Sequence, residues 1–187
     1  MSLGSPSRAA VTADGPSVRD ASERDAEACA LIYAPYVTDS AIAFEIEPPT
    51  PAEMGERIAA AQRTHAWVGL EDQGRVVGYA YGGPDKEQPR TAGQARSAST
   101  SSATGQGPAA ARALHDALLG QLAARGFRTA VAGMTLPKAA SVGLHPAISF
   151  RTVGTYRAIG CRNATWRDIA WTQRAIGIGD DPPAKVR

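Results

Sequence analysis

Apolar residues alternate or run together over 66–71 and again over 75–81, with Asp72-Gln73-Gly74 between the two segments. A short link that contains glycine between two such segments is typical of a tight turn, so this region predicts a β-hairpin. Similar but shorter patterns predict further strands at 17–20, 128–133, 151–157 and 168–174.

Residues that favour helix starts precede two helical patterns. Ser22 is placed to cap a helix, and its apolar face is predicted to carry Ala28, Leu31 and Ile32. Thr50, followed by Pro51 and Glu53, has the residues of a capping box with proline at the first helical position, which predicts a helix to about Arg63.

Two later helices are predicted near 109–124, where Gly126 follows, and near 139–147. Helices therefore alternate with strands along the chain, which predicts an α/β fold with a mixed sheet. We expect a single domain at 17–176, between a disordered leader at 1–16, rich in Ser, Ala, Gly and Pro, and a flexible tail at 177–187.

Composition narrows the function classes only slightly. The chain has 187 residues, of which 43% are hydrophobic, and a net charge of +2 with scattered Lys and Arg, so no nucleic-acid partner is expected. Cys29 and Cys161 are expected to be free thiols rather than a disulfide or a metal site. No apolar run approaches the ~20 residues that span a bilayer, so we expect no membrane partner and a cytoplasmic location.

Four segments carry a resemblance to a known family: VRDASERDAEACALIYAPYV from Val18, RVVGYAYGGPDKE from Arg75, RTAVAGMTLPKAASVGLH from Arg128, and WRDIAWTQR from Trp166. Together they resemble phosphinothricin-type N-acetyltransferases of the GNAT superfamily. The resemblance implies a GNAT-like, mostly antiparallel central sheet flanked by helices, acetyl-CoA as co-substrate and a homodimer. No metal is expected, because His65 and His115 have no carboxylate or Cys partner at ligand spacing. Trp166, Asp168 and Trp171 belong to the last segment and are assigned mainly to packing, with a dimer contact as an alternative.

In this family, a fourth strand leads into a Gly-rich loop whose backbone N–H groups bind the pyrophosphate of acetyl-CoA at a helix N-terminus. Here only Gln106 and Ala111 match the loop pattern; Pro108 lacks an N–H, and Ala109 replaces a glycine, so we expect weakened anion binding. By itself, Pro108 is more simply read as the start of an Ala-rich helix. The cofactor-binding residues implied by the resemblance are Ser99, Thr100, Ser101, Gln106, Gly107, Pro108, Ala109, Ala110, Ala111, Arg112, Lys138 and Ser141.

The segment before that loop, 94–103, reads QARSASTSSA and has the composition of a linker. Alignment to the family without gaps places Arg96 where the catalytic Glu would be. One hypothesis is a pair of compensating frameshifts, in the gene or in the recorded sequence. A shifted frame from Gln88 permits the family string AYRWAEVSVYL, and the original frame resumes at Arg112.

His145 is the candidate catalytic residue, because the family pattern S-x-x-L-H is intact from Ser141. An imidazole there can protonate the departing CoA thiolate or relay a proton. Pro146 directly after it weakens this assignment, since proline inside a helix removes a backbone hydrogen bond. Lys138 for a family Asn and Ser149 for a helix-ending Gly are further departures, whereas His65 and His115 are expected at the surface.

The family acetylates small amino-acid-like anions such as phosphinothricin or methionine sulfoximine. Candidate substrate contacts are Tyr36, Phe44, Glu45 and Lys86, which would otherwise be core aromatics and solvated charges. Two alternatives to a small-molecule N-acetyltransferase stay open. One is a catalytically impaired relic that still binds acyl-CoA, and the other is an enzyme that acetylates protein lysines or N-termini.

Overall fold

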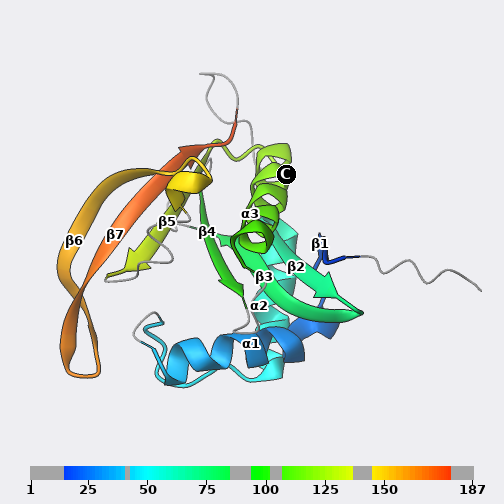
Figure 1. Ribbon diagram of the computed structural model, residues 1–187, viewed down its shortest axis with the longest axis horizontal. Coiled ribbons are helices and arrows are strands. Elements are labelled where there is room, and N and C mark those ends of the chain that lie inside the picture. The colour runs from blue at the N-terminus through cyan, green and yellow to red at the C-terminus, as the bar shows by residue number, and fades with distance from the viewer. Residues whose placement is uncertain (1–14, 41–42, 85–93, 102–106, 137–144, 178–187) are drawn as a thin grey trace, which may run out of the picture.

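The computed structural model describes residues 15–40, 43–84, 94–101, 107–136 and 145–177, with β4 described by its backbone. Its elements combine one sheet with helices on both faces (Figure 1). In chain order they are β1 (Ser17–Asp20), the 3-10 helix η1 (Glu23–Asp25), α1 (Ala26–Thr38), α2 (Pro51–Thr64), β2 (Ala66–Asp72), β3 (Arg75–Gly83), β4 (Gln94–Ser101), α3 (Gly107–Ala124), β5 (Thr129–Thr135), β6 (Arg151–Arg162) and β7 (Thr165–Ala175).

The seven strands form one sheet in the order β1-β2-β3-β4-β5-β7-β6. Only β4 and β5 pair in parallel; the other described pairs are antiparallel. The predicted α/β class and mostly antiparallel mixed sheet are therefore confirmed. The linker prediction for 94–103 was wrong, because Gln94–Ser101 forms strand β4, paired with β3 and β5.

Alternate residues of β2 and β3 supply two separate cores. Val68, Leu70 and Ala80 pack with leucines of α3 on one face of the sheet. Trp67 and Tyr79 pack with α1 and α2 on the other face. Because successive side chains of a strand point to opposite faces, a strand buried on both sides needs apolar residues at nearly every position, as the sequence of β2 shows.

The predicted hairpin turn and the Thr50 cap form as expected, but the predicted Ser22 cap of the helix that carries Ala28 was wrong: Ser22 precedes the 3-10 helix η1, its hydroxyl donates to the Asp25 carboxylate at 3.3 Å, and α1 begins only at Ala26. Gln73 and Gly74 have φ values of 49° and 75°, which suit the tight β2–β3 turn, and the Thr50 N–H donates to the Glu53 carboxylate at 2.7 Å. In α1, however, Leu31 is 69% exposed, while Cys29 and Ile32 are buried. The predicted apolar face of this helix was therefore wrong at Leu31.

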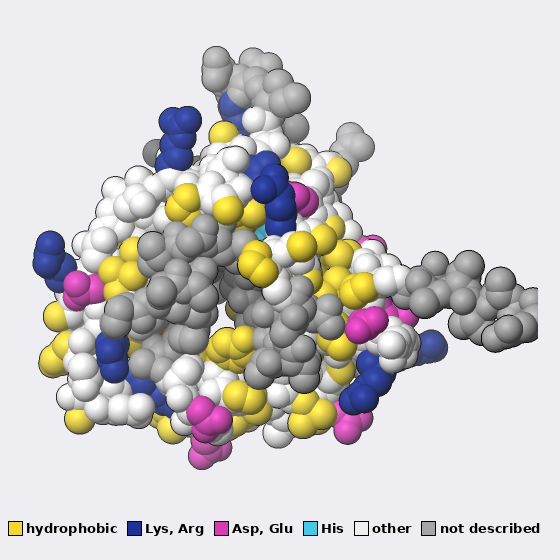
Figure 2. All heavy atoms as spheres, in the orientation of Figure 1, with side chains coloured by type: hydrophobic (Ala, Val, Ile, Leu, Met, Phe, Trp, Pro, Cys, Tyr) yellow, Lys and Arg dark blue, Asp and Glu magenta, His cyan; other side chains and the backbone are white. Residues whose placement is uncertain are grey.

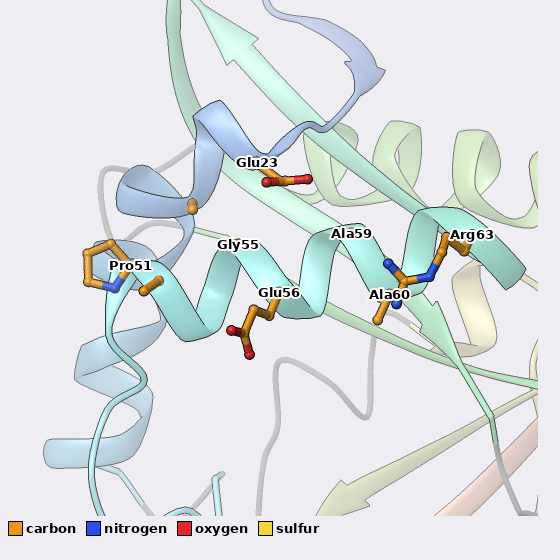
Figure 3. Close-up of a pocket in the computed structure, with 9 residues that line it drawn as sticks. Glu23, Pro51, Gly55, Glu56, Ala59, Ala60 and Arg63 are labelled. Carbon is orange, nitrogen blue, oxygen red and sulfur yellow. The ribbon is translucent and has the colours of Figure 1, made fainter.

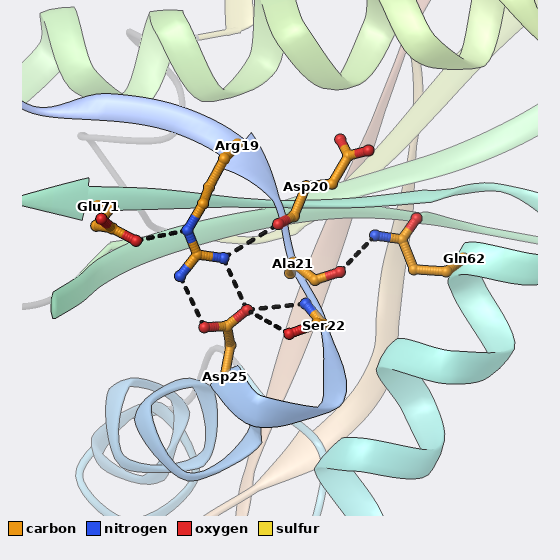
Figure 4. Close-up of polar contacts among 7 residues, drawn as sticks. All are labelled: Arg19, Asp20, Ala21, Ser22, Asp25, Gln62 and Glu71. Carbon is orange, nitrogen blue, oxygen red and sulfur yellow. Dashed lines mark hydrogen bonds and ion pairs between the residues drawn. The ribbon is translucent and has the colours of Figure 1, made fainter. Parts of the chain in front are cut away.

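Arg19 on β1 forms hydrogen bonds to carboxylates of η1 and β2 (Figure 4). The Arg19 guanidinium donates to both oxygens of Asp25, at 2.8 and 2.9 Å, and its Nε donates to Glu71 at 2.5 Å. Hydrogen bonds from Arg19 are the main reason that the pKa of Asp25 is lowered. This cluster joins β1, η1 and β2, and Asp25 also accepts from the Ser22 N–H at 2.8 Å.

Strands β6 and β7 form a long twisted ribbon that extends from the sheet (Figure 1). Asn163 and Ala164, with φ values of 51° and 56°, form its tight turn. The Asp168 carboxylate accepts the Ala158 N–H at 2.9 Å, where the pairing of β6 is irregular. Trp171 contacts Tyr156, at 6.2 Å between ring centroids, whereas Trp166 is 65% exposed. Most of the Trp166 side chain is therefore left uncovered by the described residues.

Candidate active site

Strands β4 and β5 are paired only where both begin. Residues 94–96 lie opposite 129–131, and the described pairing between these two strands stops there. Farther along, β4 continues beside β3, and β5 continues beside β7 (Figure 1). Backbone groups on the facing edges of two diverging strands can bind an extended ligand in the manner of a third strand.

Helix α3 is the element that follows β4 in the chain. Gly107 has a φ of 67° and, like Pro108 and Ala109, is exposed. The predicted cofactor residues Gly107–Arg112 form the first turns of this helix, and Ser99–Ser101 are the last three residues of β4. Gln106, Lys138 and Ser141 lie outside the described residues. Small side chains at an exposed helix N-terminus leave room for an anion, although Pro108 has no N–H to offer.

His145 lies in a helical segment, described over 145–147, that packs beside α3. Arg112 of α3 donates to the Ala147 carbonyl at 3.2 Å. The His145 side chain is 8% exposed, with ring centroids 6.1 Å from His115 and 5.4 Å from Phe150, both edge-on. His145 therefore lies on the α3 side of the sheet, and the Pro146 that follows it lies within this turn.

The turn ends in a left-handed residue. Ser149 has a φ of 65°, and the Phe150 N–H donates to the His145 carbonyl at 2.9 Å. Glycine adopts such a φ without steric cost, which explains the helix-ending glycine implied by the family resemblance. Serine retains the conformation here, so the departure leaves the turn intact.

Two histidines expected at the surface are buried, and that expectation was wrong. His115 is 1% exposed, and its Nδ1 lies 2.9 Å from the Ala111 carbonyl oxygen. His65 is 7% exposed and stacks on Phe127 at 4.7 Å. Burial lowers the pKa of both imidazoles. His115 shares the buried face of α3 with its leucines at helical spacing (Leu118, Leu119, Leu122), a signal that the sequence analysis did not use.

A pocket of about 470 Å³ lies on the opposite face of the sheet. Aromatic residues of three elements line it: Tyr33 from α1, Trp67 from β2, and Tyr79 and Tyr81 from β3. The Trp67 ring stacks on Tyr81 at 4.5 Å and on Tyr79 at 5.1 Å between centroids. This volume and lining are typical of a small-ligand site.

The rim of this pocket touches the strand where β4 and β5 diverge. Gly82 and Gly83 line the pocket and lie opposite Ser97 and Arg96 in the β3–β4 register. Arg96 also lies opposite Val131 at the last described β4–β5 pair. The position that the resemblance aligns with the catalytic Glu thus lies between the pocket and the opening of the strands.

A charged cluster closes one edge of the pocket. The Glu45 carboxylate accepts two hydrogen bonds from Arg57, both at 2.9 Å, and a third from the Tyr33 hydroxyl at 3.0 Å. The bonds from Arg57 are the main reason that the pKa of Glu45 is lowered. Burial, followed by the charge of Glu45, raises the pKa of the Tyr33 phenol. At neutral pH, therefore, the cluster is a phenol, a carboxylate and a guanidinium.

The four predicted substrate contacts differ in their placement. Glu45 lies at the pocket edge through its bonds to the lining residues Tyr33 and Arg57. Phe44 is 41% exposed, and Tyr36 lies in α1 with its carbonyl accepting from the Ser40 hydroxyl at 2.6 Å. Lys86 lies outside the described residues.

The sequence analysis did not identify four of the residues that line this pocket: Tyr33, Arg57, Trp67 and Tyr81. The partners Arg57 and Glu45 are 12 residues apart and come from a helix and a loop, so no local spacing connects them. The aromatic residues at alternate positions 79 and 81 of β3 are a signal of one shared strand face, and the sequence analysis did not use it.

A second groove, of about 600 Å³, lies along the outer side of α2 (Figure 3). Glu23, Glu56 and Arg63 border it, over a floor of Ala and Gly residues. Ala60 and Arg63 also line the aromatic pocket, whereas no residue of β4 or β5 lines this groove. On the face in Figure 2, Lys and Arg side chains are scattered rather than gathered in one patch.

Two further findings concern metals and membranes. Among the residues that the structure describes, no three His, Cys, Asp or Glu side chains are grouped so as to hold a metal ion. Within the same residues, no helix is long and apolar enough to cross a membrane. Cys29 is buried and Cys161 exposed, and both are free thiols as predicted.

The chain is similar to characterised enzymes along most of its length. It is 32% identical to a phosphinothricin N-acetyltransferase of Streptomyces viridochromogenes, over 91% of this chain and 92% of the relative. A phosphinothricin N-acetyltransferase of Streptomyces coelicolor is 30% identical over 85% of this chain and 95% of its own. No family model matches the chain.

The chain belongs to the phosphinothricin N-acetyltransferase family.

Solved structures agree with this assignment to the GNAT superfamily. A GNAT phosphinothricin acetyltransferase from Sinorhizobium meliloti, solved in complex with acetyl-CoA, has a TM-score of 0.86 and 28% identity, covering 92% of this chain and 96% of its own. An N-acetyltransferase from Staphylococcus aureus has a TM-score of 0.82 and 25% identity, covering 87% of this chain and 99% of its own. The predicted family and enzyme class, an N-acetyltransferase, are confirmed.

Proposed function

We propose that this N-acetyltransferase transfers the acetyl group of acetyl-CoA to the amino group of a small amino-acid-like acceptor of the phosphinothricin or methionine sulfoximine type. One observation carries the proposal. The aromatic pocket reaches Gly83, which lies opposite position 96 at the point where β4 and β5 diverge. An acceptor in the pocket would therefore meet a thioester held between the two strands.

The size and charge of the pocket support a small anionic acceptor. Its volume of about 470 Å³ is near the lower end of ligand sites, which suits an amino acid better than a folded protein segment. Each terminal nitrogen of Arg57 donates one hydrogen bond to the Glu45 carboxylate. The guanidinium has further N–H donors that can bind the carboxylate or phosphinate of the acceptor. Arg57 would thus hold the anionic group of the acceptor.

The reaction needs an unprotonated amine. The acceptor's ammonium first loses one proton, and its nitrogen then forms the new C–N bond as the C–S bond of the thioester breaks. The acylated nitrogen loses a second proton to become the amide. The CoA thiolate then takes up a proton, so one proton is released overall. Direct transfer within a ternary complex requires only these steps and no covalent enzyme intermediate.

We propose that His145 protonates the departing CoA thiolate or relays a proton to it. Its turn packs beside the first half of α3, where Arg112 bonds the Ala147 carbonyl. That position is on the cofactor side of the sheet, away from the aromatic pocket. His145→Gln should lower kcat and alter the alkaline or acidic limb of the pH–rate profile, whereas a structural role would change stability without changing the profile.

Acetyl-CoA is proposed to bind at the opening of β4 and β5 with its pyrophosphate near the start of α3. Exposed Gly107 and Ala109, with a partly buried Ala110, present small side chains there. Because Pro108 has no N–H, we expect pyrophosphate binding at this helix start to be weaker but not lost. A thioester bound here supplies the acetyl group and a thiolate leaving group.

The alternative, an impaired relic that binds acyl-CoA, is favoured by one observation. Arg96 occupies the register position of the family's Glu, and a cation does not accept a proton. In the relic, acetyl-CoA binds but acetyl transfer is no faster than the uncatalysed reaction. Binding and turnover measured on the same preparation separate the two readings.

A homodimer is also proposed. Four apolar side chains of the β6–β7 hairpin are 57–65% exposed: Val153, Tyr156, Ile159 and Trp166. Several exposed apolar side chains on one hairpin favour a protein contact. Light scattering should give twice the mass of the 19.4 kDa chain. Trp166→Glu should shift that mass toward the monomer.

The experiment that tests the function is an acceptor panel. Purified protein and acetyl-CoA are mixed with phosphinothricin, methionine sulfoximine or a peptide with a free N-terminal alanine, and the acetylated product is detected by mass spectrometry. The proposal expects turnover with the small anions and not with the peptide. Turnover confined to the peptide, or none with any acceptor, would contradict it.

A further inference from the structure

Arg162, at the end of β6, reaches across the fold to two distant backbone carbonyls. Its guanidinium donates to the Glu45 carbonyl at 3.0 Å and, through its other terminal nitrogen, to the Val37 carbonyl. Val37 lies in the last turn of α1, where carbonyl groups lack helical partners and attract cations. One side chain of the hairpin thus holds both ends of the segment between α1 and Glu45.

Two residues earlier on the same strand, Gly160 makes room for Phe44. A Cβ atom added at Gly160 would overlap the ring of Phe44. Gly160 is not among the residues with positive φ, so its backbone would accept alanine. The absence of a side chain at this position is therefore explained by the Phe44 ring and not by backbone conformation.

We propose that the β6–β7 hairpin positions the acceptor side of the active site, with Arg162 as a positioning residue and Gly160 as the seat of the Phe44 ring. The inference rests on the proposed function, because it names the hairpin as the support of the acceptor pocket. The Glu45 backbone is held by Arg162, while its carboxylate is held by Arg57 and Tyr33. Loss of the backbone anchor would let the carboxylate leave the pocket edge.

Arg162→Ala tests the anchor. Because hydrogen bonds from a charged donor contribute more than neutral ones, the acceptor KM should rise about tenfold. The KM for acetyl-CoA should stay unchanged, because the described hydrogen bonds of Arg162 go to Val37 and Glu45, on the acceptor side. Arg162→Lys, which keeps one cationic donor group, should recover part of the loss. Arg157→Ala, an exposed arginine of the same strand, is the matched control and should change neither constant.

Gly160→Ala tests the seat of the ring. The added methyl group should displace Phe44 and raise the acceptor KM several-fold. Gly154→Ala is the matched control, since a Cβ there meets nothing within 4 Å on the same strand. In a Phe44→Ala background, Gly160→Ala should have no further effect, because the clash is gone. An equal effect with and without Phe44 would overturn the seat.

A structural measurement keeps this inference separate from the proposed function. Amide hydrogen exchange at residues 44–47 should rise in Arg162→Ala and stay unchanged in Arg157→Ala, whether or not the protein turns over any acceptor. Light scattering on both variants shows whether the oligomeric mass has changed. Unchanged exchange, or equal losses in the KM for acetyl-CoA and for the acceptor, would overturn the inference. Failure of the unsubstituted chain to acetylate any acceptor would instead overturn the proposed function.

Discussion

The acceptor pocket and the cofactor side meet at β4, but they differ in how complete their chemistry is. At the pocket, Tyr33, Glu45 and Arg57 satisfy one another with three hydrogen bonds of 2.9–3.0 Å. On the cofactor side, Arg96 stands where the family resemblance implies a carboxylate, and Pro108 removes an N–H from the helix start. Under the proposed function, acceptor recognition and proton removal depend on separate parts of this fold, so substitutions should separate them.

The largest effect is expected from Arg96→Glu. A positioned general base contributes about 10²–10⁴-fold to a reaction of this kind, so kcat should rise about 100-fold or more, with little change in the acceptor KM. Initial rates of free-thiol release measure both constants. Peptide mapping over residues 75–128 should first establish that the purified protein carries QARSASTSSATGQGPAAAR, as printed from Gln94.

Arg96→Gln is the matched control for this prediction, because it removes the positive charge without adding a base. Equal rates for the Glu and Gln variants would show that charge alone matters at position 96. Peptides carrying a Glu-Val-Ser-Val-Tyr strand instead of the printed letters would show that the protein already has its base.

A smaller effect is expected from Glu45→Gln on the other side of the comparison. Losing a carboxylate that accepts three hydrogen bonds should raise the acceptor KM about three- to tenfold and leave the KM for acetyl-CoA unchanged. Glu47→Gln, an exposed neighbour, is the control and should change neither value. A rise in both KM values would mean that the two sides are not separate.

The lowered pKa of Glu45 also fixes the direction of a pH effect. Because the carboxylate is easier to ionise in the folded state, its contribution to stability is fully present above the ordinary pKa of 4.5 and is lost as the pH falls through the lower folded value. Thermal unfolding of Glu45→Gln should therefore approach that of the unsubstituted chain below pH 4.5. A difference that persists at low pH would contradict the ion pair.

The smallest effect is expected at Ser149, beside the His145 turn. A non-glycine residue at a φ of 65° is disfavoured, so Ser149→Gly should stabilise the fold by about 0.4–1 kcal/mol, or roughly 1–4 °C in Tm. Gly126→Ala, at a φ of 95°, should destabilise it. Neither change should alter the acceptor KM. A lowered Tm in Ser149→Gly would contradict the proposed cost of this turn.

Much of the fold could be predicted because its signals are local. The Gln73-Gly74 turn, the capping box at Thr50 and the glycine after α3 each act within a few residues, and each formed as expected. Strand β4 was missed because its composition has no strand signal of its own. Pairing with β3 on one side and β5 on the other supplies what the local sequence lacks.

The candidate site was predictable only in part, because its contacts are long-range. Glu45 was selected through the family resemblance, but its partners Arg57 and Arg162 are 12 and 117 residues away in the chain. The burial of His115, in contrast, was predictable, because it lies at helical spacing from the apolar residues Leu118, Leu119 and Leu122. The cofactor residues on β4 and α3 stay predictions of the resemblance, since no ligand contact tests them.

The most direct test of this account is a crystal structure of the protein with acetyl-CoA and phosphinothricin. The account predicts the acceptor among Tyr33, Arg57 and Tyr81, with its amino group toward Gly83 and the thioester between β4 and β5. An acceptor bound elsewhere, such as in the groove outside α2, or an acceptor pocket that stays empty while acetyl-CoA is bound, would contradict it.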